Sequence, residues 1–339
     1  MTQTKSALLL KMLLIASFLC GTGLALFSYK ETARAALKVM KRIKSILCPT
    51  TLSDDSDLAI GYAVALARIF EAELHLCYCA TVSSWSGIAA APTMAHLEVA
   101  GLFDQSLAPY LKQPDNLKWQ GVVIGGSDPA EAIVRESIVR GVDLIVMCSR
   151  RRPLAAALMG SVAESVCRTA PCPVLVTHPD KRQWTATEAG NINLQKVLVA
   201  HDFSDYSELA LQAGTMFAQE FHSELHLLHV LPPTRRQEPE LAWTDFGKEN
   251  PYHQMARRLQ RSIPQESASW CAKVLTAVQE GPPYREILGY ADEQAADLIC
   301  LGAHGANFGA NTLFGSNVDR VLRQAGCPVL VARPRRTGH

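Results

Sequence analysis

Glycines between positions 302 and 316 make this stretch of the chain the best suited to hold a phosphate. Gly302 and Gly305 precede Gly315 and Ser316, which open an apolar run with helical spacing. Glycine lets the backbone approach a ligand closely and can adopt positive φ. The free N–H groups and the dipole at the start of a helix favour an anion. The spacing therefore indicates a loop that can hold phosphate.

Two side chains could add chemistry to this loop, and one pattern within it needs no ligand. Asp202 follows an apolar segment at 196–200 and could accept a ribose hydroxyl or hold a metal ion. His304 is near enough in sequence to reach a phosphate. However, Ser316 and Asp319 also fit the Ser-x-x-Asp capping pattern, which closes a helix start without a ligand. Spacing alone leaves phosphate binding and a capped turn as equal alternatives.

The elements that would position these residues occur twice. "SILCPTTLSDDSDLAI" aligns with "KVLVAHDFSDYSELAL", "EAELHLCYC" with "HSELHLLHV", "GVDLIVMCS" with "AADLICLGA" and "APCPVLVTHP" with "AGCPVLVARP", all in the same order. A period of about 150 residues is too long for a solenoid and indicates a domain duplication. The predicted copies run over 40–178 and 194–334, joined by a polar linker at 179–193.

Each copy alternates short apolar strands with amphipathic helices. Continuous apolar strands are typical of strands covered on both faces, which predicts an open parallel sheet with helices on both sides. Ligands bind such sheets at the carboxyl ends of the strands, where the strand order reverses. In the second copy, the loop after 196–200 should face the loop that begins at 302 if the first and fourth strands are neighbours at that point.

At this point the residues resemble a known family. Gly302-x2-Gly305-x9-Gly315-Ser316 is similar to the nucleotide motif of the universal stress protein superfamily, and "VLVAHDFS" resembles that family's first strand and its aspartate. The resemblance covers about residues 43–334. The duplicated layout looks like that of the tandem, E-type members.

The resemblance implies an α/β fold with strand order 3-2-1-4-5 in each copy and, in one subfamily, ATP binding, expected here with Mg²⁺. It also implies that the last strands, 172–176 and 327–331, pair within the chain to give a pseudo-dimer, with a homo-dimer as a further arrangement. The positions that match the family's nucleotide-binding residues are Ala200, His201, Asp202, Val230, Leu301, Gly302, His304, Gly305, Gly315, Ser316, Asn317 and Val318.

The first copy departs from this pattern. Thr51 replaces the aspartate, Cys148 stands at the first glycine position, and arginines 150–152 lie near the second. Ser161-x-x-Glu164 is a complete capping box. Loss of the ligand explains this copy most simply, and binding of another anion by the arginines is the alternative. Because one copy lacks the glycines, the comparison predicts that the fold itself does not need them.

These features predict a stress-response protein that binds ATP through its second domain and acts as a switch or scaffold. No Walker-type lysine and no base–nucleophile pair are evident, so we expect no dedicated enzyme, with slow ATP hydrolysis as the most that is feasible. A scaffold that works without nucleotide is the alternative. The sequence does not identify its protein partners.

Composition and the N-terminal segment limit which partners and which cellular locations we expect. A net charge of +1 gives no general drive toward nucleic acid, and the ten cysteines form no cluster at zinc spacing. Residues 12–29 are uncharged and just long enough to span a bilayer, with basic residues after them. A membrane anchor with cytoplasmic domains and a gene start misplaced ahead of Met40 fit equally, and a secretory signal fits less well. The expected location is the cytoplasm, with or without a tether to the inner membrane.

Overall fold

The computed structural model describes most of the chain after residue 42. It covers residues 43–52, 54–80, 92–111, 116–149, 161–178, 184, 192–233, 250–263, 270–305 and 315–334. The predicted anchor at 12–29 and the arginines at 150–152 lie outside the described residues. Within those ranges, no helix is both long and apolar enough to cross a membrane.

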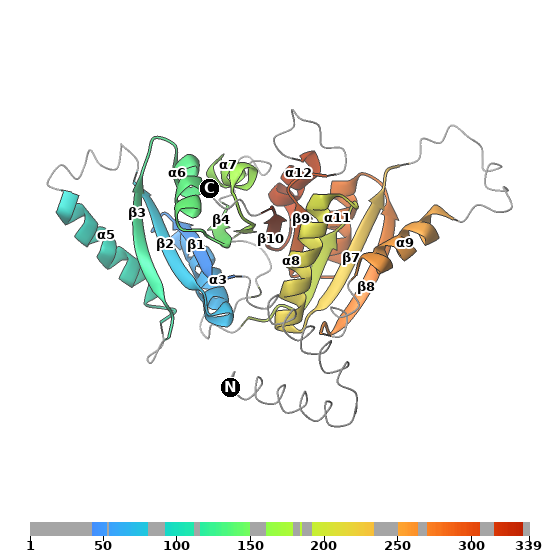
Figure 1. Cartoon of the computed structure of the whole chain (residues 1–339), viewed down its shortest axis with the longest axis horizontal. Coiled ribbons are helices and arrows are strands. Elements are labelled where there is room, and N and C mark those ends of the chain that lie inside the picture. Colours follow the sequence, from blue (N-terminus) through green and yellow to red (C-terminus); the bar gives the residue numbers. More distant parts are fainter. Residues whose placement is uncertain are drawn as a thin grey trace, which may run out of the picture. The chain divides into compact units, whose positions relative to one another are not determined.

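Ten strands form a single sheet in the order β3-β2-β1-β4-β5-β10-β9-β6-β7-β8 (Figure 1). Within each half the order is 3-2-1-4-5 and neighbouring strands are parallel, as predicted. The strands of the first half are β1 (Ser45–Thr50), β2 (Glu73–Ala80), β3 (Trp119–Gly125), β4 (Leu144–Cys148) and β5 (Val174–Thr177). Those of the second half are β6 (Lys196–Ala200), β7 (Glu224–Leu231), β8 (Lys273–Glu280), β9 (Leu298–Gly302) and β10 (Val329–Ala332).

Helices cover both faces of the sheet, and each face has its own apolar core. On one face lie α3 (Asp54–Phe70), α5 (Pro92–Leu107), α8 (Asp205–Phe221) and α9 (Pro251–Ser262). On the other lie α6 (Pro129–Val139), α7 (Ser161–Thr169), α11 (Pro283–Glu293) and α12 (Ser316–Gln324). Burial of apolar strand residues on both sides is what the continuous apolar runs predicted.

The two halves join through their last strands. β5 and β10 pair antiparallel, with Val176 opposite Val329 and Val174 opposite Val331. This confirms the predicted pairing, which leaves neither strand as an exposed edge. It also means that the two expected five-stranded sheets are one continuous sheet, because the pairing joins their edges through backbone hydrogen bonds.

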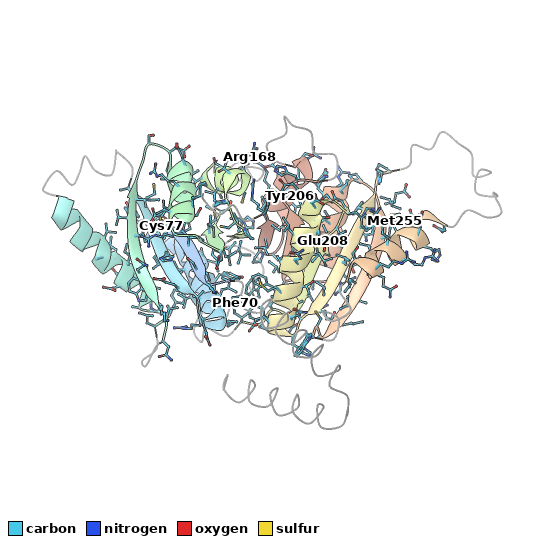
Figure 2. The ribbon with its side chains drawn as sticks, viewed as in Figure 1. Phe70, Cys77, Arg168, Tyr206, Glu208 and Met255 are labelled. Atoms are coloured by element: carbon cyan, nitrogen blue, oxygen red, sulfur yellow. The ribbon has the colours of Figure 1, made fainter. Side chains whose placement is uncertain are left out.

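A tryptophan of the predicted linker is part of the core. Trp184 is 2% exposed, and its ring meets Tyr62 of α3 edge to face with centroids 4.6 Å apart. Its backbone N–H donates to the Tyr62 hydroxyl at 3.1 Å. On the other side it contacts the rings of Phe217 and Phe221 of α8. Phe217 also meets Phe70 of α3, which Figure 2 labels. The linker therefore supplies a side chain that packs between the two copies.

Polar contacts join the copies on the opposite face of the sheet. The Arg323 guanidinium on α12 donates to Glu164 of α7 at 2.9 Å and to Asp319 on its own helix at 2.9 Å. Arg333, just after β10, donates to the backbone carbonyl of Cys167. Glu164, expected in a capping box, is thus held by Arg323 and by Arg168 at 2.5 Å.

Candidate functional site

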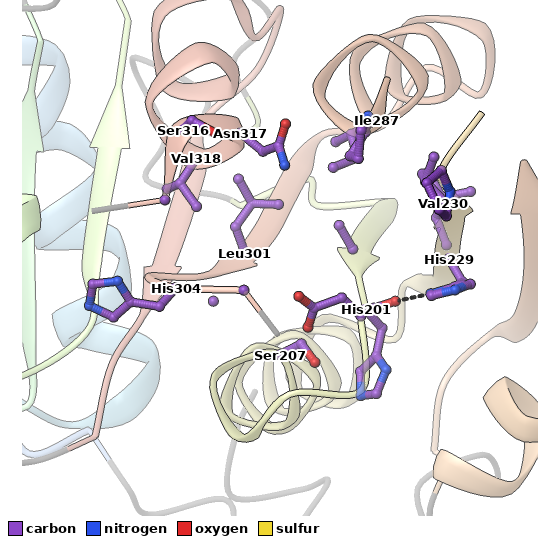
Figure 3. Close-up of a pocket in the computed structure, with 18 residues that line it drawn as sticks. His201, Ser207, His229, Val230, Ile287, Leu301, His304, Ser316, Asn317 and Val318 are labelled. Atoms are coloured by element: carbon purple, nitrogen blue, oxygen red, sulfur yellow. Dashed lines mark hydrogen bonds between the residues drawn. The ribbon is translucent and has the colours of Figure 1, made fainter. Parts of the chain in front are cut away.

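A cavity of about 440 Å³ opens at the carboxyl ends of β6, β7 and β9 in the second copy (Figure 3). All twelve residues that the sequence singled out line it. Six further residues complete the lining: Ser207, Leu228, His229, Pro232, Pro283 and Ile287.

The strand order brings two loops face to face across this cavity. β6 and β9 are neighbours in the sheet, although about 100 residues of chain separate them. A Cβ added at Gly305, after β9, would lie 2.8 Å from Oδ2 of Asp202, after β6. The predicted meeting of the two loops is therefore confirmed.

Asp202 combines a structural contact with one oxygen turned toward the opposite loop. Its Oδ1 accepts from the Ser204 backbone N–H at 3.1 Å and from the Ser204 hydroxyl at 2.6 Å. Ser204 is the N-cap of α8, as predicted, and accepts from Ser207 N–H. Oδ2 is the atom nearest Gly305. The carboxylate thus fixes the start of α8 with one oxygen and presents the other to the gap between the loops.

His201 offers its backbone rather than its ring. Nδ1 accepts from Phe203 N–H at 3.2 Å, and Nε2 lies 3.5 Å from Glu208. The ring points away from Leu301 and Val318, while the His201 carbonyl accepts from Nδ1 of His229 at 2.7 Å (Figure 3). Burial lowers the pKa of His201 despite the neighbouring Glu208, so the ring is neutral at pH 7.

Gly302 has a packing role that the sequence did not predict. A Cβ at this position would lie 2.6 Å from the backbone carbonyl carbon of Tyr206, so α8 can lie directly on β9 only if residue 302 is glycine. The expectation that the fold does not need the motif's glycines is therefore wrong for Gly302.

No side chain among the described residues caps the start of α12. Gly315 is the N-cap, and Ser316 is already the first helical residue. The predicted Ser-x-x-Asp cap is absent, since both Asp319 oxygens accept from Arg323, at 2.9 and 3.0 Å. Ser316, Asn317 and Val318 instead line the cavity with the first turn of the helix (Figure 3). An uncapped first turn leaves backbone N–H groups available to an anion.

The His304 ring belongs to the protein interior. It is 5% exposed and meets Tyr206 edge to face, with centroids 4.7 Å apart. Figure 3 shows the ring turned away from Leu301 and Asn317. Burial lowers its pKa, and the positive charge of Arg333 lowers it further. A neutral ring in this position supplies no positive charge to the cavity, and contact between His304 and a phosphate remains a prediction.

The wall opposite the loops is apolar. Leu228 and Val230 come from β7, Pro283 and Ile287 from the start of α11, and Leu301 from β9. Sequence analysis missed most of these residues, yet a signal was present: Pro282-Pro283 opens a helix directly after a strand, which places it at the carboxyl edge of the sheet.

Charge is sparse around the cavity. Asp202 is the single carboxylate among the described lining residues, which include neither lysine nor arginine. In the part of the chain that the structure describes, no three His, Cys, Asp or Glu side chains gather in a way that could hold a metal ion. The arrangement can bind an anion through backbone groups beside an apolar slot.

Comparison with known proteins identifies similar chains. The model of the universal stress protein family matches residues 42–178 and 193–333. A universal stress protein of Mycolicibacterium smegmatis is 25% identical over 310 residues, which cover 86% of this chain and 97% of that protein. One from Methanocaldococcus jannaschii is 29% identical over 144 residues, covering 41% and 82%. A solved universal stress protein from Archaeoglobus fulgidus shares the fold, with a TM-score of 0.58 and 21% identity over 87% of this chain and 98% of that one.

Proposed function

We propose that this chain, which belongs to the universal stress protein family as a tandem two-domain member, binds ATP in the cavity of its second domain. Binding would let the protein act as a nucleotide-dependent switch or scaffold in the stress response. The observation that carries the proposal is the uncapped start of α12, which opens into the same cavity as Asp202 and the apolar wall.

Each part of a nucleotide has a matching group in this cavity. The backbone N–H groups of Ser316, Asn317 and Val318 suit phosphate oxygens. Oδ2 of Asp202 suits a ribose hydroxyl as hydrogen-bond acceptor. The wall formed by Val230 and Ile287 suits the apolar faces of a base. A volume of about 440 Å³ lies within the range of small-molecule sites.

Mg²⁺ would enter with the phosphates. Magnesium sites in nucleotide-binding proteins commonly use one or two carboxylates together with phosphate oxygens and water. Asp202, the one carboxylate on the described lining, would hold the ion only as an alternative to the ribose hydroxyl. Fast hydrolysis is not expected, because the His304 ring is buried against Tyr206 and one Asp202 oxygen is held by Ser204. Slow turnover is compatible with these residues.

A switch requires that ligand binding affect another part of the protein, and α12 provides a route. Its first turn lines the cavity, and Arg323 on its last turn contacts Glu164 of the first copy. A shift of this short helix on binding would change the contact between the copies. Nucleotide binding should therefore change how strongly added salt weakens the ion pair between Arg323 and Glu164.

The test is titration calorimetry of the full chain with ATP, with and without Mg²⁺. cAMP, with which another universal stress protein has been solved as a complex, serves as the comparison ligand. Asp202→Ala should weaken ATP binding about tenfold or more, the usual cost of losing a hydrogen bond to a charged group. Thr51→Ala, at the matching position of the first copy, should leave the affinity unchanged.

Two results would count against the proposal. One is absence of binding at millimolar ATP with Mg²⁺, which would leave a scaffold that acts without nucleotide. The other is equal weakening by Asp202→Ala and Thr51→Ala, which would place the ligand outside the second domain.

A further inference from the structure

The ten-stranded sheet ends in two strands that are paired on one side only. β3 is the last strand at one end and β8 the last at the other, and among the described residues no further strand pairs with either (Figure 1). The six residues Val274–Gln279 of β8 are each half-buried, whereas every residue of the central strand β9 is buried. A strand at the edge of a sheet presents backbone N–H and C=O groups to which another strand can pair.

The helices at these two ends carry opposite charge and lie on the same face of the sheet. α9 packs on β8 and contains Arg257, Arg258 and Arg261, all exposed, but no Asp or Glu. α5 packs on β3 and contains Glu98 and the exposed Asp104, but no Lys or Arg. Because the two copies share one fold, the fold itself does not require either sign of charge at this place.

Large apolar side chains are exposed at both ends as well. Among the described residues five such side chains are exposed, and three of them lie here: Leu102 of α5 at 42%, Tyr252 of α9 at 39% and Trp270, just before β8, at 38%. Aromatic side chains and arginines are enriched in the central part of protein interfaces. The two ends therefore combine an unpaired strand, apolar side chains and charge of opposite sign.

The direction of the strands permits these ends to meet. β5 and β10 pair antiparallel, so β3 and β8 run in opposite directions within one sheet. When a second chain in the same orientation continues the sheet, its β3 lies antiparallel to β8 of the first chain. Val274 and Val278 of β8 face the same side of the sheet as Trp119 and Val123 of β3. An antiparallel register can then set Val274 opposite Val123 and Val278 opposite Trp119, and such pairs stabilise a sheet.

Charge selects this arrangement over the two symmetrical ones. Pairing β8 with β8 of a second chain would place the three arginines of α9 beside the same three arginines, and pairing β3 with β3 would place the acidic helices together. Pairing β8 with β3 instead sets α9 beside α5, where the charges attract. The register described above also brings Lys118, just before β3, next to Glu280 at the end of β8.

We propose that this chain associates head to tail with further copies of itself, with β8 of one chain paired to β3 of the next and α9 in contact with α5. A contact between two different surfaces repeats from chain to chain, so it gives a ring or an open filament instead of a closed dimer. The association uses no residue of the cavity and needs no nucleotide, so it goes beyond the proposed function.

The experiment measures the mass of the full chain by sedimentation over a wide range of protein concentration. Arg257→Glu with Arg261→Glu reverses the charge of α9, and Glu98→Lys with Asp104→Lys reverses that of α5. Either pair of changes sets like charges against each other at every junction, so the association constant should fall about tenfold or more. Arg258 is left unchanged because its guanidinium lies 3.8 Å from the centre of the Phe203 ring.

Mixing the two variants is the decisive arm. In the mixture a reversed α9 meets a reversed α5 and each natural helix meets its natural partner, so the association constant should return to within about threefold of the natural value. A single chain that carries all four changes should behave in the same way. Arg320→Glu, a reversal on α12 beside β10 in the middle of the sheet, is the matched control and should leave the association unchanged.

Three results would overturn the proposal. The first is the mass of a single chain at every concentration of the natural protein. The second is stronger association of the α9 variant, which would mean that β8 pairs with β8. The third is association that is weakened by the variants but restored neither by mixing nor by the fourfold change, which would mean that these charges do not face each other.

Discussion

The two copies share a backbone design but differ in the residues placed on it. Leu52 in the first copy and Phe203 in the second both have left-handed φ, at 53° and 64°, just after the first strand. In each copy the backbone N–H of this residue donates to the side chain two positions earlier. The acceptor is Oγ1 of Thr50 at 2.9 Å in the first copy and Nδ1 of His201 at 3.2 Å in the second. The strained turn is therefore a property of the fold, which both copies keep, and it says nothing about a ligand.

Two of the residues that differ between the copies line the cavity. Asp202 stands where the first copy has Thr51, and Val230 stands where it has Cys79. Since the strands form in both copies, neither change is required to form them. Gly302 differs as well, but its contact with the Tyr206 backbone explains it through packing. Comparison within one chain thus separates what the fold requires from what a ligand would require.

The largest expected effect on stability concerns Trp184, the buried linker residue whose ring contacts both copies. Trp184→Ala should lower the free energy of unfolding by about 3–5 kcal/mol, because it removes a buried indole that packs against both Tyr62 and Phe217. Trp184→Phe should cost less, since it keeps part of the aromatic contact. Urea unfolding of the full chain measures both. A loss below about 1 kcal/mol for Trp184→Ala would mean that the linker does not hold the copies together.

An exchange at the first motif glycine tests whether packing distinguishes the copies. Gly302→Cys should destabilise the protein by about 1–3 kcal/mol, because its Cβ would meet the α8 backbone. The reverse change, Cys148→Gly, introduces no clash and should cost about 1 kcal/mol through lost packing and added chain entropy. Denaturant unfolding compares the two variants. A Gly302→Cys variant as stable as the natural chain would show that packing does not require this glycine. The glycine would then be explained by ligand binding instead.

The copies should also differ in their response to pH. Burial lowers the pKa of His201, His226 and His304 in the second copy and of His75 in the first. The unfolded chain then binds more protons than the folded chain once the pH falls below the ordinary histidine pKa, near 6.5. The free energy of unfolding should therefore decrease from pH 7.5 toward pH 5.5.

The variant that sharpens this prediction is His201→Thr, which installs the residue of the first copy. The threonine hydroxyl can accept the same backbone N–H, as Thr50 does, so the turn should be kept while one buried titrating group is lost. Urea unfolding at several pH values should give a shallower pH dependence for this variant. A stability that rises as the pH falls from 7.5 to 5.5 would contradict the account.

The smallest expected effect lies in the turn before the fourth strand of each copy. Ala295 has φ of 55°, where the first copy has Gly141 at 60°. Glycine adopts this conformation without strain, so Ala295→Gly should raise the free energy of unfolding by about 0.5–1 kcal/mol. Gly141→Ala should lower it by a similar amount, although nothing crowds its Cβ. Equal effects of the same sign would show that the two turns are not equivalent.

Sequence analysis predicted the strand order, the pairing of the last strands and all twelve residues proposed for the cavity. All three were implied by the resemblance to the family, which a short motif and the residues of the flanking strands carry. Apolar periodicity and the repeat by themselves predicted only the two copies and their open parallel sheets. It missed Trp184, because a single aromatic residue in a polar segment gives no periodic signal. It also missed the packing reason for Gly302, since that depends on the Tyr206 backbone in an adjacent element.

The most direct test of the central claim is to count and locate bound nucleotide in the full chain. The protein is purified, denatured and analysed for released ATP or ADP, beside Gly315→Val in the second copy and Gly160→Val in the first. A valine at 315 would crowd Val318 and the Ala303 carbonyl at the start of α12. The account predicts about one adenine nucleotide per chain in the natural protein and in Gly160→Val, and none in Gly315→Val. Nucleotide that persists in Gly315→Val, or that disappears only in Gly160→Val, would contradict it.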